Sequence, residues 1–235
     1  MFKKNICLIA ILALFSGCVQ KNVQNETYDL SNHWFNAENL NNNKVILNKN
    51  FTEQFNDGEK TSSYIDYKVY KKSKTNLNQI ERYSFFEDIN KENYKSMIST
   101  EHADLKYDIS INEVKKSSAI DEKQKSIYKR NIKINDKVIE ENDKDGKSLV
   151  CSFSNYYENI NTKDKINEFF KAKYSTKDNK YKNVIEIVCK DNSVDGEYYV
   201  YMAKNIGIIL FMKKDIDDGS SEETYSILDT QTIME

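Results

Sequence analysis

The sequence has 235 residues, and its 35 basic and 37 acidic side chains give a net charge of −2. This balance excludes the basic excess that is typical of nucleic-acid-binding proteins, so we expect no nucleic-acid partner. The chain has no proline, 16 Tyr, 11 Phe and only 6 Gly. That composition indicates a folded, strand-rich protein rather than a disordered one.

The first 17 residues have the pattern of a secretory signal peptide. Two lysines precede an unbroken apolar run over residues 6–15, and Ser16, Gly17 and Cys18 follow it. As a helix, this run would extend about 15 Å, half of the ~30 Å hydrocarbon layer of a bilayer. It is therefore too short to span a membrane, and we expect residues 1–17 to be removed after export.

The Phe-Ser-Gly-Cys ending of this segment resembles the lipobox of bacterial lipoproteins, although Phe15 stands where that family usually has Leu. The resemblance implies that Cys18 is acylated and becomes the new N-terminus. It also implies an exported protein that contacts the membrane through its lipid anchor. The anchor would lie on the outer face of the cytoplasmic membrane, or in the outer membrane if the cell has one. The alternative is an ordinary signal peptide that contains a cysteine.

Residues 18–32 are mostly polar and are predicted to form a tether between the lipidated cysteine and the domain. We expect a single β-rich extracytoplasmic domain over residues 33–235. No internal repeat and no linker divides this region.

The first half of the domain carries alternating patterns that are typical of strands. Val45, Leu47, Phe51 and Phe55 fall on one face of an extended segment, and a turn at residues 56–58 leads into a second alternating run. Residues 79–87 are compatible with strand or helix. Further strands are predicted at about 105–111, 127–134, 138–140 and 149–153, with a polar connection over 115–125.

The second half contains one helix and the most regular strands. Ile166, Phe169 and Phe170 form one stripe of a helix over about 162–173, which Asn161 or Thr162 can cap. Four strands follow at 184–189, 198–203, 206–212 and 224–228, joined by short turns. They are apolar on both faces, so both faces should be covered.

These patterns predict a mainly β (α+β) fold. We expect an antiparallel meander sheet, curved or sandwich-like, with one or two packed helices. The run over 199–209 resembles a strand-turn-strand ending of uncharacterised β-rich extracytoplasmic lipoproteins. This chain has Asn205 at a position where those proteins have glycine. Because Asn tolerates the left-handed conformation, the turn should survive. The resemblance carries over no catalytic residue.

No segment has the spacing of a catalytic, phosphate-binding, dinucleotide-binding or zinc motif. His102 has Glu101 and Asp104 nearby, but such neighbours are common in polar loops. Acidic residues at 141–146 and 215–219 imitate part of a calcium loop, yet hairpin turns explain them better. We therefore predict no catalytic residue, no metal site and no cofactor.

Cys151 and Cys189 are the only thiols expected in the mature domain, and both fall in predicted strands. An exported protein can join them in a disulfide if their Cα atoms lie within about 7 Å. The alternative is two buried free thiols that act as small apolar residues.

Three classes of function remain open. The first is a non-enzymatic binding or interaction module at the cell envelope, with an unknown ligand or protein partner. The second is a lipid or lipoprotein carrier, because a long meander closed by a helix resembles a half-barrel with a cavity. The third is a hydrolase of envelope polymers. An apolar cavity would favour the carrier, and a cleft with paired carboxylates would favour the hydrolase.

Overall fold

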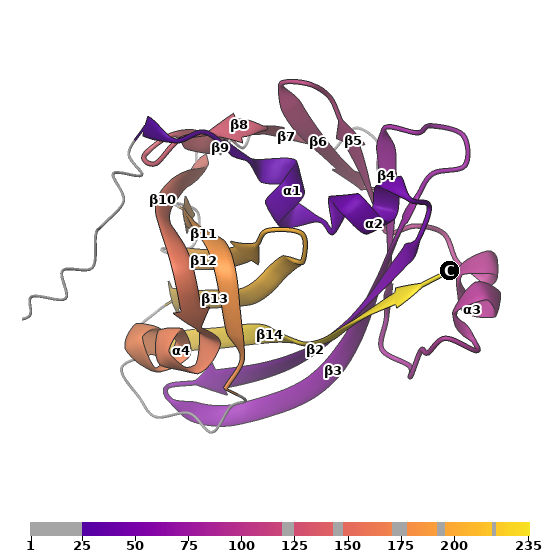
Figure 1. The fold of residues 1–235 in the computed structure, drawn as a ribbon. Coiled ribbons are helices and arrows are strands. Elements are labelled where there is room, and N and C mark those ends of the chain that lie inside the picture. The colour runs from indigo at the N-terminus through magenta and orange to yellow at the C-terminus, as the bar shows by residue number, and fades with distance from the viewer. Residues whose placement is uncertain (1–24, 119–124, 143–147, 171–177, 192–195, 218–219) are drawn as a thin grey trace, which may run out of the picture.

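The computed structural model describes residues 25–118, 125–142, 148–170, 178–191, 196–217 and 220–235. Twelve strands in these ranges form one antiparallel sheet that curls into a nearly closed barrel (Figure 1). The prediction of a mainly β protein with an antiparallel, curved sheet and packed helices is confirmed. The predicted lipid attachment site Cys18 and the signal peptide lie outside the described residues.

The elements follow one another along the chain with these bounds. The helices are α1 (Leu30–Trp34), α2 (Ala37–Asn41), α3 (Tyr94–Thr100) and α4 (Thr162–Phe170). The strands of the first half are β1 (Tyr28–Asp29), β2 (Val45–Asn56), β3 (Glu59–Lys72), β4 (Gln79–Phe85), β5 (Leu105–Ile109), β6 (Glu113–Ser118) and β7 (Lys125–Lys129). The strands of the second half are β8 (Asn131–Ile132), β9 (Lys137–Asn142), β10 (Ser148–Asn161), β11 (Lys180–Asp191), β12 (Gly196–Ala203), β13 (Gly207–Asp217) and β14 (Ser220–Met234).

The sheet order is β7-β6-β5-β4-β3-β2-β14-β13-β12-β11-β10-β9. Sequence neighbours therefore pair throughout, except that the last strand, β14, lies beside the first long strand, β2. Local turn chemistry explains much of this order. Asp57 and Gly58 join β2 to β3 with φ of 49° and 80°, the left-handed values that a two-residue hairpin turn requires. The chain end thus closes the sheet at its middle, and β7 and β9 remain as its two edges.

The segment before β2 lies within the barrel rather than outside it. β1 pairs with β8 to form a separate two-stranded ladder, and α1 and α2 follow it across the barrel (Figure 1). Tyr28, Leu30 and Trp34 are buried in the largest core cluster. Residues 28–32 are therefore part of the domain, which begins before residue 33, because burial of Tyr28 and Leu30 holds them against the sheet.

The two longest helices, α3 and α4, lie on the outer face of the sheet (Figure 1). In α4, Asn161 accepts a hydrogen bond from the backbone of Lys163 at 3.0 Å and so begins the helix. Ile166 and Phe170 are buried against β13 and β14, whereas Phe169 is only half-buried. The last three residues of the predicted helix, 171–173, lie outside the described residues.

One predicted connection is a strand. Residues 115–118 belong to β6, although the sequence suggested a polar linker over 115–125. Its lysines and serines resemble a solvated loop, but Val114 is fully buried and Lys116 is directed toward the interior beside buried Tyr107. Inward and outward residues therefore alternate along β6, and a lysine, Lys116, occupies one of the inward positions.

Candidate functional site: an apolar cavity inside the barrel

A cavity of about 340 Å³ lies between α1 and the inner face of the barrel. Small-molecule sites occupy ~300–1,000 Å³, so the space is large enough for a small ligand. Most of its wall is aliphatic, aromatic or sulfur-containing. These residues are Leu30, Trp34, Val138, Leu149, Cys151, Ile187, Cys189, Val200, Met202, Ile208 and Phe211.

Strand alternation explains why these side chains meet. In β12, Val200 and Met202 line the cavity, whereas Tyr199 and Tyr201 lie on the outer face near α4. The sequence indicated that this strand is apolar on both faces. The two faces have different surroundings in the structure, because the inner residues border a cavity and the outer residues border α4.

The few polar groups of the cavity gather toward one rim of the barrel. Lys116 lies near the end of β6 and Asp191 ends β11. Three strands lie between β6 and β2, and three more lie between β2 and β11. Because each neighbouring pair is antiparallel, β6, β2 and β11 run in the same direction. Both residues therefore lie toward one rim, while α1 contacts the β12–β13 turn at the opposite rim.

Electrostatics at this rim are unusual for an apolar cavity. Burial lowers the pKa of Lys116, nearby Arg82 lowers it further, and Glu141 opposes both. Within the described part of the chain, Lys116 has no ion-pair partner. Tyr198 donates a hydrogen bond to Asp191 at 3.2 Å. Burial and the charges of Asp215 and Asp191 raise the pKa of Tyr198 to about 12. The cavity thus joins an apolar body to a small charged end.

The two cysteines form part of the cavity wall. Cys151 of β10 lies directly opposite Cys189 of β11, and their sulfur atoms are bonded in a disulfide. The sequence left open whether these thiols were bridged or free. Directly opposed residues of neighbouring strands share a face, so the bond fixes β10 to β11 at the cavity.

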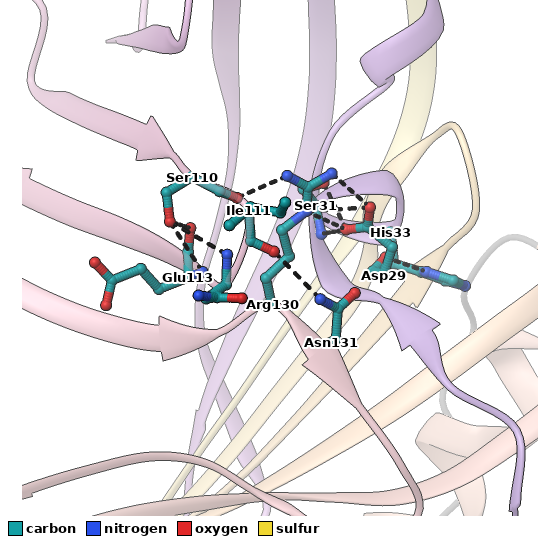
Figure 2. A network of polar contacts seen from close by, with 9 residues as sticks. Asp29, Ser31, His33, Ser110, Ile111, Glu113, Arg130 and Asn131 are labelled. Atoms are coloured by element: carbon teal, nitrogen blue, oxygen red, sulfur yellow. Dashed lines mark hydrogen bonds and ion pairs between the residues drawn. The ribbon is translucent and has the colours of Figure 1, made fainter.

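An ion pair between Asp29 and Arg130 holds α1 in the barrel (Figure 2). The Arg130 side chain donates to both carboxylate oxygens of Asp29 at 2.7–3.1 Å, and to the carbonyl oxygen of Ser110 at 2.7 Å. Asp29 also begins α1, because it accepts from the Ser31 amide at 2.9 Å. Burial alone would raise the pKa of Asp29, but the hydrogen bonds from Arg130 and Ser31 outweigh it and lower that pKa.

A second contact fixes α1 at the turn between β12 and β13. The amide of Asn205 donates to the carbonyl oxygen of Asn32 at 2.7 Å. Asn205 has φ of 60°, so it holds the left-handed turn conformation expected from the sequence. A Cβ atom at Gly207 would lie only 2.9 Å from the carbonyl oxygen of Trp34. Glycine is therefore needed here for α1 to approach the sheet.

His33 is buried in α1 and packs beside Tyr28. Its Nδ1 lies 3.0 Å from the carbonyl oxygen of Asp29, and its Nε2 is buried without a hydrogen-bond partner among the described residues. Burial lowers the pKa of His33, and the charge of Lys204 acts in the same direction. The imidazole therefore stays neutral at pH values where an exposed histidine takes up a proton.

The other residues that the sequence singled out do not converge on a site. His102 is exposed, and Asp104 forms an ion pair with Arg82 instead. Among the described residues, no group of three metal-ligating side chains comes together. Residues 143–147 and 218–219 of the two calcium-like segments lie outside the described ranges. In the described part of the chain, no helix has the length and hydropathy needed to cross a membrane.

No family model, curated protein or solved structure that we compared matches the chain.

Proposed function

We propose that this protein is a lipid-anchored binding protein of the cell envelope that holds an apolar chain in the cavity of its barrel. The cavity between α1 and the sheet is the observation that supports this reading. Its wall is almost entirely apolar, and such a surface gains free energy when an alkyl chain replaces water, ~0.8 kcal/mol per buried methylene. A protein core is normally packed without such a space.

The anchor and the cavity would act together. Two or more acyl chains on Cys18 would hold the barrel at a membrane surface, where apolar ligands are concentrated. The same arrangement suits a carrier of single-chain lipids or of acylated proteins, which is the form of binding module that the cavity favours.

Trp34 provides a direct assay, because it lines the cavity and is the only tryptophan of the chain. Titration with laurate or dodecanol should change its fluorescence with a saturable curve. Val200→Phe, which places a ring in the cavity, should weaken binding at least about tenfold, or ~1.4 kcal/mol.

Val188→Phe is the matched control. Val188 lies on the outer face of β11, opposite Tyr199. The substitution therefore adds the same side-chain volume on the other side of the sheet. The proposal fails if neither amphiphile binds, or if Val200→Phe and Val188→Phe bind alike while both remain folded by circular dichroism.

A further inference from the structure

A second cavity, of about 510 Å³, lies on the outer face of the barrel between α4 and strands β10–β13. It is separated from the first by the sheet itself, because Tyr199 and Tyr201 line it while their neighbour Val200 lines the inner cavity. Tyr157, Phe169 and Phe170 bring its aromatic lining to five rings. Nothing in the proposed apolar-chain site uses these residues.

The floor of this outer cavity carries a buried carboxylate without a cation. Glu186 is 8 % exposed and accepts hydrogen bonds from the hydroxyls of Ser154 and Tyr157, the latter at 2.9 Å. These hydroxyls satisfy its oxygens but carry no compensating charge. Within the described residues, no lysine, arginine or histidine forms an ion pair with Glu186. A buried carboxylate is normally paired with a cation, whereas the hydrogen bonds to this one come from hydroxyl groups.

Both lysines that line the cavity already form ion pairs with glutamates, one partner inside the lining and one outside it. Lys165 contacts Glu168 at 2.9 Å, and Lys214 contacts Glu223 at 2.5 Å. With three glutamates and two lysines, the lining has an excess of one negative charge. Lys165 Nζ also lies 4.8 Å from the centre of the Tyr157 ring. The aromatic wall therefore already accommodates one ammonium group on a ring face.

We propose that this outer cavity binds a small organic ammonium ion. The rings of Tyr199 and Tyr201 would contact the cation beside the Tyr157 face that Lys165 occupies, and Glu186 would supply the opposite charge. Aromatic rings and a carboxylate are the groups by which proteins recognise alkylated ammonium ions, since the ring faces are electron-rich and replace water around the methyl groups. Quaternary and primary amines share this chemistry, and the experiment distinguishes them.

The test is calorimetric titration of the full chain with choline, with n-butylamine, and with 3,3-dimethylbutanol, the uncharged isostere of choline. We expect choline or n-butylamine to bind, and the isostere to bind at least about tenfold more weakly. Which of the two amines binds more tightly identifies a quaternary or a primary ligand. Equal binding of choline and its isostere, or no binding of either amine, would overturn the proposal.

Variants assign the binding to this cavity. Glu186→Gln keeps hydrogen-bond acceptors but removes the charge, so it should weaken amine binding at least about tenfold. Glu158→Gln is the matched control, because Glu158 is exposed on the neighbouring strand β10 and does not line the cavity. Tyr199→Leu should lose binding and Tyr199→Phe should retain it. This pair keeps the inference testable if Glu186→Gln does not fold, and equal binding by Leu and Phe at this position would refute a role of the ring.

Discussion

Removal of the Arg130 side chain should weaken the attachment of α1 to the barrel. Arg130 makes a forked contact to Asp29 at the start of α1 and donates a further hydrogen bond to the carbonyl oxygen of Ser110, between β5 and β6. Hydrogen bonds to charged groups contribute about 1.5–3 kcal/mol when buried, whereas exposed ion pairs contribute about 0.2–1 kcal/mol. The two side chains are 27 % and 24 % exposed, an intermediate case. We therefore expect Arg130→Ala to cost about 1–2 kcal/mol.

Native-state hydrogen exchange can locate this loss. The amide of Leu30 donates to the carbonyl oxygen of Arg130, and the amide of Asn205 donates to that of Asn32. A loss of 1–2 kcal/mol corresponds to about 5- to 30-fold faster exchange at these amides, with little change in α4. Acrylamide should also quench Trp34 more strongly, since this residue is only 8 % exposed in the closed state.

Two further variants separate the ion pair from the helix cap. Asp29→Asn preserves a capping acceptor but removes the charge, and Arg130→Lys keeps the charge but removes the fork. In a double-mutant cycle, Asp29→Asn and Arg130→Ala should couple by about 1 kcal/mol. The reasoning would be refuted by a coupling within error of zero together with unchanged exchange at Leu30.

Four other outcomes are expected. Cys18→Ser should release the protein from the membrane fraction and abolish uptake of labelled fatty acid. Alkylation of the denatured, unreduced protein should label neither Cys151 nor Cys189, and reduction should lower the stability by about 3–4 kcal/mol because the bond closes a loop of 38 residues. Phe170→Ala should cost about 3–5 kcal/mol in urea unfolding, since its ring is buried. Because the pKa of His33 is lowered by burial, its contribution to stability is complete above the unfolded pKa of about 6.5 and is lost as the pH falls. The stability should then decline by up to about 1.4 kcal/mol per pH unit, and His33→Gln should flatten this slope.

Local signals predicted the elements well because their causes are local. The Asp57-Gly58 turn and the alternation of β2 and β3 depend on residues that are adjacent in the chain. The stripe of Ile166 and Phe170 likewise predicts α4 without knowledge of its partner strands. The sequence could also indicate that the C-terminal strands were covered on both faces, since their apolar residues do not alternate with polar ones.

The candidate site could not be predicted in this way, because distant residues build it. Asp29 and Arg130 are separated by 101 positions. Asp29 falls in the segment predicted to be a tether, and Arg130 falls in a predicted strand over 127–134. Lys116 resembles a solvated lysine until the register of β6 places it inside the barrel. A possible signal was the pair Tyr28 and Leu30, two large apolar residues in an otherwise polar stretch.

The width of the sheet explains why the first described segment becomes an internal plug. A barrel of about eight strands is just wide enough for side chains to fill, and barrels of about sixteen strands leave an aqueous channel. Twelve strands form a nearly closed ring here, so side chains from the wall alone cannot fill the interior. α1 supplies Leu30 and Trp34 to that space, and Gly207 allows its backbone to approach the wall. A five-residue helix is too small to complete the packing, and the cavity is the volume that remains beside it. A ligand chain in this cavity would therefore extend the same apolar packing that α1 begins.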